Sequence, residues 1–290
     1  MAQPRRSTPV DAAPEDSVPV ESWLAEWGRS LDDAADAWQP ELTSLLDHLS
    51  PLGGSAVLDA GCGSGRITGW IAERVGPRGS VCALDREEDA LRLTHAALRG
   101  DPTRHVEGWL GSLEHLPFDD DTFDATWCSS VLGYLADPGQ GLRELVRVTR
   151  PGGRILALTG DAARAMFLPI DPALETRLHL AEHRAMRAGA WGSPIDIHLG
   201  RRLYSLACDL PVASIEPMSV VWERTAPLLP VERAYLTSVL AWLTDPASRR
   251  WLRRDWDACR DLFHPDSDRC LIDRDDLHVV QTATAVVITV

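Results

Sequence analysis

The sequence contains no lysine, and all 29 of its basic residues are arginines. A Walker-type phosphate loop uses a lysine to bind the β- and γ-phosphates of a nucleotide, and pyridoxal phosphate enzymes use a lysine amine to form a Schiff base. The absence of lysine therefore excludes both classes of protein.

Long apolar runs and paired cysteines are also missing. No run approaches the roughly 20 apolar residues that span a bilayer, and the first residues lack the charged, apolar and small segments of a secretion signal. The six cysteines form no C-x-x-C pair, so reduced thiols are expected rather than a disulfide framework. We expect a cytoplasmic protein.

The charge balance is acidic, with 43 acidic against 29 basic residues and a net charge of −14. Such a surface repels phosphate backbones and anionic lipids, so neither nucleic acid nor a membrane is expected as a partner. A small-molecule partner is favoured instead. The arginine- and tryptophan-rich stretch 249–263 is typical of an amphipathic helix, and a subunit interface there, giving a homodimer, is left open.

Short apolar runs alternate with helical patterns, which is typical of a parallel sheet with crossover helices. Strands are expected at 56–60, 80–85, 105–112, 123–128 and 154–159, and helices at 65–75, 87–99 and 137–149. Two later runs close the sheet, and the last one is expected to be antiparallel. The predicted fold class is α/β, a doubly wound, mostly parallel seven-stranded sheet of the Rossmann-like type with helical cap segments.

We predict one domain at 21–290 behind a proline-rich disordered arm at 1–20. The domain is expected to comprise an N-terminal helical lid at 21–49 with a joint at Pro40, a cofactor-binding core at 55–160, helical substrate or cap segments at 161–210 and 224–277, and closing strands at 211–223 and 278–290. Metabolites of moderate size, apolar or aromatic, suit such an enclosed arrangement.

The stretch VLDAGCGSGRITGW, residues 57–70, runs from a strand into three alternating glycines. Ligands of open α/β sheets bind at the carboxyl ends of the strands. Asp85 ends the strand expected at 80–85, so its carboxylate can accept hydrogen bonds from the hydroxyls of a ribose. A dinucleotide fingerprint needs glycine at the position of Arg66. Asp59 suits an ammonium group better than a pyrophosphate. The loop therefore favours a cationic or zwitterionic ligand that carries adenosine.

The sequence resembles the class I S-adenosylmethionine-dependent methyltransferases. "VLDAGCGSGRIT" is similar to their first motif, "VCALD" to the second, "GSLEHLPFDDDTFDATWCSSVLGYLADP" to the third and fourth, and "ELVRVTRPGGRILAL" to the segment around the fifth strand. The likeness is close over about residues 50–160. It implies S-adenosylmethionine as cofactor, S-adenosylhomocysteine as product, and in-line methyl transfer to a small molecule of specialised biosynthesis.

The resemblance also implies roles for individual residues. Asp59 and the backbone of Ala60, Gly61 and Gly63 face the methionine part, Asp85 and Arg86 hold the ribose, Ser112 and Leu113 bind the adenine, and Cys128 and Ser129 offer backbone contacts near the sulfonium. One position departs from the family, which often has aspartate where this chain has Ser112. A hydroxyl accepts a hydrogen bond from the adenine amino group more weakly than a carboxylate does.

Four further side chains are candidates for the lid and for catalysis. Trp23 and Trp27 lie one turn apart on the first helix, which in the family commonly covers the cofactor; a plain core role is the alternative. Tyr134 is expected at the mouth of the pocket, unless it is an ordinary half-buried tyrosine. His183 is expected to overhang the pocket as a general base.

Several alternatives stay open. His179 and His183 are spaced i, i+4, but no third ligand accompanies them, so no metal site is predicted. His198 and Tyr204 are weaker candidates for the base. A cofactor-bound cyclase or a non-catalytic protein on the same fold is the alternative function, and an NAD(P)-dependent oxidoreductase is less favoured. Oxygen, nitrogen and carbon all stay open as the methyl-accepting atom.

Overall fold

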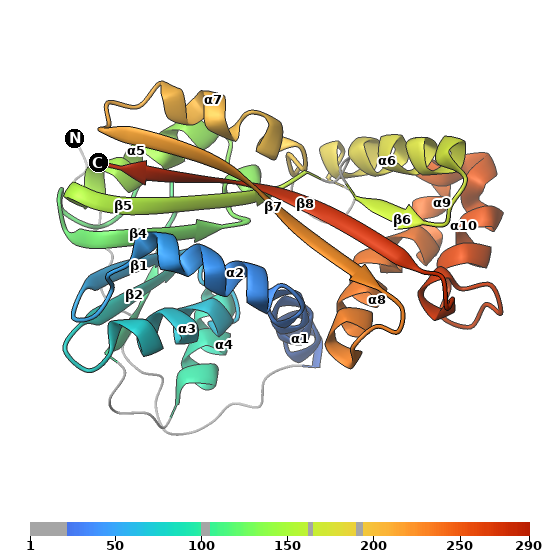
Figure 1. Cartoon of the computed structure of the whole chain (residues 1–290), viewed down its shortest axis with the longest axis horizontal. Helices are drawn as coiled ribbons and strands as arrows, with labels where there is room; N and C mark the ends of the chain where they lie inside the picture. Colours follow the sequence, from blue (N-terminus) through green and yellow to red (C-terminus); the bar gives the residue numbers. More distant parts are fainter. Residues whose placement is uncertain (1–21, 100–104, 162–164, 190–193) are drawn as a thin grey trace.

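The computed structural model describes residues 22–99, 105–161, 165–189 and 194–290 (Figure 1). The arm expected at 1–20 lies outside this range. An eight-stranded sheet has the order β3-β2-β1-β4-β5-β8-β6, and β7 pairs with the other edge of β8. This arrangement confirms the predicted α/β fold class.

Five parallel strands form the first half of the sheet. They are β1 (Ala56–Ala60), β2 (Ser80–Asp85), β3 (Val106–Leu110), β4 (Phe123–Ser129) and β5 (Thr149–Gly160), connected by α3 (Arg66–Val75), α4 (Glu88–Leu98) and α5 (Pro138–Val148). All lie close to the predicted ranges. β5 begins earlier than expected, because Thr149 already pairs with Phe123 before a register shift in β4.

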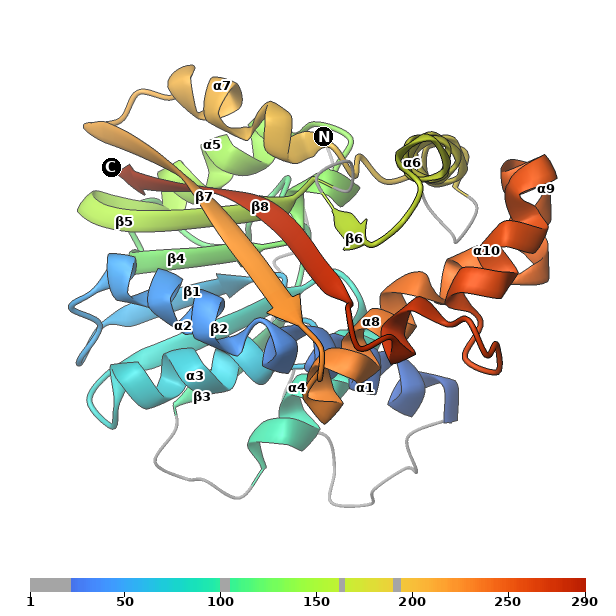
Figure 2. The ribbon, with the colours of Figure 1, turned by 45° about the vertical axis from the view of Figure 1, so that its right-hand side comes forward.

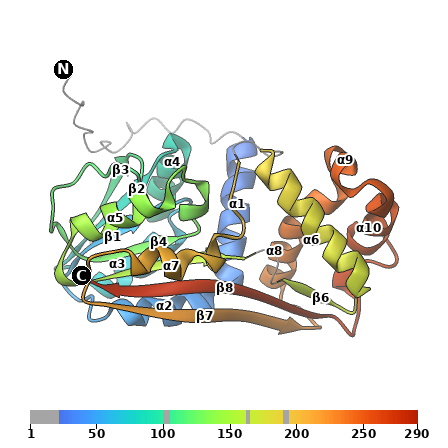
Figure 3. The same cartoon turned by 90° about the horizontal axis from the view of Figure 1, so that it is seen from above.

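The strands alternate their side chains between two buried faces, as the period of two requires. Val57 of β1 packs with α3 and with α2 (Gln39–Leu46) on one face. Its neighbour Leu58 packs on the other face with α5 and with α7 (Leu203–Cys208). Helices therefore cover both faces of the sheet, which identifies it as doubly wound (Figure 3).

Two long strands extend the sheet toward a helical cap. β7 (Ser214–Thr225) and β8 (His278–Thr289) pair antiparallel over their whole length, and β8 also runs antiparallel to β5, as predicted for the last strand. The far end of β8 pairs with β6 (Met166–Leu168), a three-residue strand that the sequence analysis did not predict. Figure 2 shows one end of the β7–β8 pair running diagonally beyond the parallel strands toward α8.

The cap is formed by helices from both ends of the chain. They are α1 (Ser22–Ala37), α6 (Pro172–Arg187), α8 (Pro230–Thr244), α9 (Arg249–Leu252) and α10 (Trp256–Phe263), and 3-10 turns lie at Asp47–Leu49, Leu132–Tyr134, Leu199–Arg201, Pro246–Ser248, Arg253–Asp255 and Leu271–Asp273. Pro40 stands in the first turn of α2, which explains the joint expected there.

A tryptophan of β7 connects the sheet to the joint between α1 and α2. The indole N–H of Trp222 on β7 donates to the carbonyl of Ala37 at the end of α1 (2.8 Å), and its ring stacks on Trp38 at 6.0 Å. Trp222 and Ala37 are buried in the core of the cap, and the partly buried Trp38 packs against that core. Within the described ranges, no helix has the length and apolar character needed to cross a membrane.

Candidate functional site

The loop between β1 and α3 requires glycine at two positions. Gly65 has a φ of +83°, and a Cβ there would lie 2.8 Å from the Cα of Thr94 in α4. Gly61 has a φ of +90°, and a Cβ there would overlap the side chain of Val131. The loop is thus pressed between α4 and the segment after β4, which only a backbone without side chains permits.

Asp85, the last residue of β2, is fixed beside this loop. Its two carboxylate oxygens accept the backbone N–H groups of Gly63 (3.1 Å) and Glu87 (3.0 Å). Each oxygen therefore keeps a lone pair for a ligand. The guanidinium of Arg86 lies over the ring of Tyr134 at 5.7 Å, so the ends of β2 and β4 approach each other across the site.

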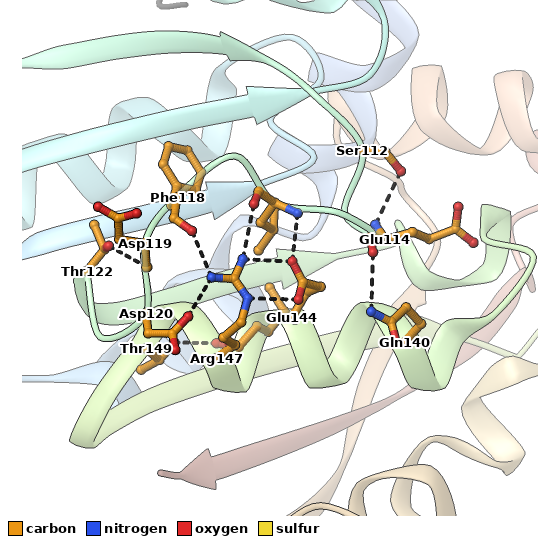
Figure 4. A network of polar contacts seen from close by, with 12 residues as sticks. Ser112, Glu114, Phe118, Asp119, Asp120, Thr122, Gln140, Glu144, Arg147 and Thr149 are labelled. Carbon is orange, nitrogen blue, oxygen red and sulfur yellow. Dashed lines mark hydrogen bonds and ion pairs between the residues drawn. The ribbon is translucent and has the colours of Figure 1, made fainter. Parts of the chain in front are cut away.

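The segment from Ser112 to Thr122 is held by α5, as Figure 4 shows. The Arg147 guanidinium donates to the carbonyls of Leu116 (3.1 Å) and Phe118 (2.8 Å), and it also pairs with the carboxylate of Asp120. Glu144 accepts the N–H of Leu116 (2.8 Å), and the adjacent Arg147 guanidinium lowers the pKa of its carboxyl group. This network fixes the turn after β3.

A cavity of about 490 Å³ opens at the carboxyl ends of the parallel strands. Residues 61–64 of the glycine loop, Ser129 and Tyr134 after β4, and Asp161 after β5 line one part of it. The other part is enclosed by apolar residues of the cap, including Leu31, Trp38, Phe167, Leu178, Leu240 and Phe263. The glycine loop and an apolar chamber therefore belong to one continuous space.

Comparisons with known proteins identify the family. Residues 58–157 match the methyltransferase domain family. The chain is 32% identical over 249 residues to an uncharacterized 37.1 kDa protein in a transposon of Streptomyces fradiae, covering 82% of this chain and 67% of that protein. It is 32% identical over 127 residues to methyltransferase GfsG of Streptomyces halstedii, covering 43% of this chain and 45% of GfsG. The chain belongs to the class I S-adenosylmethionine-dependent methyltransferases.

Solved structures show the same fold. A geranyl diphosphate methyltransferase in complex with S-adenosylmethionine superposes with a TM-score of 0.54 at 17% identity, covering 98% of this chain and 97% of that one. The YcgJ protein of Bacillus subtilis gives 0.54 at 17% identity, covering 86% and 97%. The alignment with GfsG spans less than half of that relative's length, so the relatives fix the family and leave the acceptor of this methyltransferase to its own structure.

The residues predicted for the cofactor lie around the glycine loop. Gly61, Gly63 and Ser129 line the cavity. The side chains of Ala60, Cys128 and Leu113 are buried in the core, which leaves only their backbones for a ligand. Ser112 accepts the N–H of Glu114 (3.2 Å) through its hydroxyl oxygen, so the hydroxyl proton is still available there.

Asp59 lies beneath the loop and is absent from the cavity wall. Its side chain is buried and accepts the Thr68 hydroxyl at 2.6 Å. Burial, together with the nearby charge of Asp85, raises the pKa of Asp59 to about 7. The methyltransferase thus holds a carboxylate that has no cation beside it among the described residues.

The cavity wall contains a tryptophan of the lid that was not predicted. Trp38, at the joint of α1 and α2, lines the cavity, as does Leu31. Trp27 is half-buried on α1 and does not line it, and the side chain of Trp23 lies outside the described part of the structure. Tyr134 does line the cavity, at 44% exposure, and burial raises its pKa.

The histidine of α6 that lines the cavity is His179, one turn before the predicted His183. His183 instead lies with its ring 4.8 Å from that of His198, and its buried Nδ1 has no partner among the residues described. The spacing places both histidines near one face of the helix, but only the rotation of α6 against β6 decides which one faces the cavity. The structure thus places His179, and not the predicted His183, on the cavity wall; a role as general base stays a prediction.

Sequence reasoning missed the carboxylates of the wall. Asp161 follows β5 and binds His198 Nδ1 (2.8 Å) and Arg201 Nε (2.7 Å); its place after a parallel strand was the available signal. Glu175 and Glu182 line the cavity from α6. Among the residues described, no three His, Cys, Asp or Glu side chains are placed to hold a metal ion. Tyr204 is exposed and outside the cavity wall.

Proposed function

We propose that this chain binds S-adenosylmethionine at the glycine loop and transfers its methyl group to a small molecule held in the apolar part of the cavity. The observation that carries the proposal is the continuity of the space between the loop and the cap. A demethylmenaquinone methyltransferase of Lactococcus lactis, 32% identical over 123 residues, is among the relatives and supports a small-molecule acceptor.

The residues present fit this cofactor. Asp85 keeps lone pairs for the ribose hydroxyls, and Gly61, Gly63 and Ser129 offer backbone to the methionine part. Asp59 lies beneath the loop and outside the cavity wall, so a cationic group bound at the loop would act on it through the electric field and would lower its pKa. When bound, S-adenosylmethionine supplies a methyl group on a positively charged sulfur. The chain's part is to align the two reactants and to exclude water.

Two other functions are less well supported. A nicotinamide cofactor would place its pyrophosphate at the helix N-terminus, and here Asp59 and Asp85 both lie near that loop. A cyclase or a non-catalytic protein on this fold would bind the same cofactor without consuming it. The predicted cytoplasmic location and homodimer are not needed for the proposal.

Calorimetric titration of the full chain with S-adenosylhomocysteine tests the cofactor. Asp85→Asn keeps the size of the side chain but removes the charge that receives the ribose hydroxyls. We expect affinity to fall roughly 10- to 100-fold, as for a lost hydrogen bond to a charged group. Asp89→Asn, on the surface of α4 where Asp89 pairs with Arg92, serves as the matched control and should leave affinity unchanged.

Other results would contradict the proposal. Binding of NADH with no binding of S-adenosylhomocysteine would favour an oxidoreductase. Equal losses in the two variants would show that a general effect of charge, and not the ribose site, was measured. Thermal melting of both variants checks that Asp85→Asn has not unfolded the loop, since Asp85 also accepts two backbone N–H groups.

A further inference from the structure

Among the described residues, the helices of the cap line the cavity mainly with apolar side chains, and the exceptions are Tyr235 of α8 and one polar face of α6. Glu175, His179 and Glu182 occur at i, i+4 and i+7 on that helix, and all three line the cavity. They lie among Phe167 and Leu178, and Gln281 and Thr282 of β8 are further polar side chains of the wall. The spacing gives the apolar chamber a polar end.

A hydrogen bond to the backbone determines the tautomer of His179. Its Nε2 lies 2.9 Å from the carbonyl oxygen of Ala165. Because a carbonyl only accepts hydrogen bonds, Nε2 carries the proton and the neutral ring keeps its lone pair on Nδ1. The Nδ1 atom is 3.9 Å from a carboxylate oxygen of Glu182. A proton arriving at Nδ1 would therefore be stabilised by an adjacent negative charge.

Tyr235, a second titratable side chain of the chamber, already uses its hydroxyl group in a hydrogen bond. Tyr235 of α8 donates its hydroxyl proton to Gln281 at 2.6 Å and interacts with the side chain of Trp38. Burial raises the pKa of Tyr235 to about 12, so it stays protonated. Tyr235 therefore offers no base, whereas the neutral ring of His179 keeps a lone pair on Nδ1.

The charges on the cavity wall are mostly negative. The charged side chains are Glu175 and Glu182 on α6, Asp161 after β5, Asp196 in the segment after α6, and Arg66 at the glycine loop. Arg66 is held by a bidentate ion pair with Asp36 of α1 (2.6 and 2.8 Å), so its charge is already compensated. Asp161 and Asp196 are likewise paired, with Arg201 (2.7 Å) and Arg202 (2.5 Å). The charge that an anionic acceptor would meet therefore comes mainly from Glu175 and Glu182 of α6.

We propose that the acceptor is an uncharged, mainly apolar molecule bearing a hydroxyl group, and that this hydroxyl binds to Nδ1 of His179, the nitrogen beside which the carboxylate of Glu182 lies. The proposal rests on the proposed methyl transfer. In that reaction the hydroxyl proton passes to Nδ1 while the oxygen bonds to the methyl carbon, and the electron pair of the broken carbon–sulfur bond stays on sulfur. Glu182 then stabilises the imidazolium, while Glu175 disfavours anions at the same end.

Three probes that share a naphthalene ring system and differ in their polar group test the chemical class of the acceptor. Binding of 2-naphthol, 2-naphthoate and 2-naphthylmethylamine to the full chain is measured by calorimetry at pH 7.5, without any cofactor. We expect 2-naphthol to bind and 2-naphthoate to bind roughly tenfold more weakly, because like charges meet. His179→Gln should weaken 2-naphthol about fivefold, as for one lost hydrogen bond.

Two further histidine variants make the assignment specific. His183→Gln changes the neighbouring histidine of α6 and should not alter binding of 2-naphthol. His48→Gln, on an exposed turn, controls for loss of a surface imidazole. Nitrogen NMR of labelled histidines, with His179→Gln to assign the signal, should show the Nε2-protonated form and a pKa lowered by Glu182→Gln.

The outcomes that would overturn the proposal are distinct. Equal binding of 2-naphthoate and 2-naphthol, or no binding of 2-naphthol, would remove the hydroxyl assignment. Much tighter binding of the amine, lost in Glu182→Gln, would make the wall a cation site. An effect of His183→Gln without one of His179→Gln would return the role to His183. Because these titrations use no cofactor, failure to bind S-adenosylhomocysteine would count against the proposed function separately.

Discussion

Replacing Asp59 by asparagine should stabilise the protein at alkaline pH. The Asp59 carboxyl group is buried beneath the glycine loop and accepts one hydroxyl hydrogen bond, from Thr68. Asparagine has nearly the same shape, and its carbonyl oxygen can accept the same hydrogen bond. The substitution therefore removes a buried negative charge and leaves the packing in place.

The size of the effect follows from the pKa of Asp59. Burial raises it to about 7 in the folded chain, against about 3.9 in an unfolded chain. Between these values the folded state keeps a proton that the unfolded state releases, so the stability of the natural protein falls as pH rises. At about 1.4 kcal/mol per pH unit, the penalty is about 1.5 kcal/mol at pH 5 and about 4 kcal/mol at pH 8.

Urea unfolding at pH 5 and pH 8 measures the difference. The free energy of unfolding of Asp59→Asn, relative to the natural protein, should rise by about 2 to 3 kcal/mol between the two pH values. Other titrating groups are common to both proteins and cancel. Asp89→Asn, which removes a half-exposed carboxylate of α4, should shift stability by less than about 0.5 kcal/mol at both pH values.

A stability difference that is the same at pH 5 and pH 8 would refute this reasoning, because Asp59 would then titrate alike in both states. The expected result has a functional meaning as well. A charge that weakens the free protein near neutral pH lies beneath the loop at which we propose that S-adenosylmethionine binds, so the same substitution should weaken S-adenosylhomocysteine binding at pH 8. Stability and ligand affinity would then change in opposite directions.

Three other substitutions give separate checks. Gly65→Ala forces a side chain into a backbone with φ of +83° and against α4, so urea unfolding should show a loss of about 2 kcal/mol and calorimetry weaker cofactor binding. Trp222→Phe removes a buried hydrogen bond to the end of α1 and should lower the free energy of unfolding by about 2 kcal/mol. Glu182→Gln removes the main cause that raises the pKa of His179, so the acidic midpoint of 2-naphthol binding, which needs the neutral ring, should move to lower pH.

The cofactor half of the fold was predictable because its signals are local. Three of the parallel strands, β1, β2 and β4, are followed in the chain by the helices α3, α4 and α5. The adjacent residues Val57 and Leu58 of β1 already indicate two buried faces in the sequence. The glycine loop and Asp85 likewise stand next to the strands that position them. The residues that contact the glycine loop and Asp85 come from elements that are adjacent in the chain and follow the regular alternation of strand and helix.

The acceptor half was not predictable in the same way. β6 has three residues and exists because the far end of β8, more than a hundred residues later, pairs with it. Trp38 faces the cavity because Trp222 packs on its ring from β7. The choice between His179 and His183 depends on how α6 is rotated against these distant strands, and helical periodicity gives no information on that rotation.

The same division explains how far the relatives inform the chemistry. The matched family region, 58–157, contains the glycine loop, Asp85 and Tyr134, but it ends before Asp161 and before every residue of α6. The family therefore specifies the half of the cavity that receives the cofactor, and the wall with His179 and Glu182 comes from the rest of the chain. An acceptor inferred for this protein must consequently be argued from that wall, and the charge carried there disfavours an anion whatever the relatives methylate.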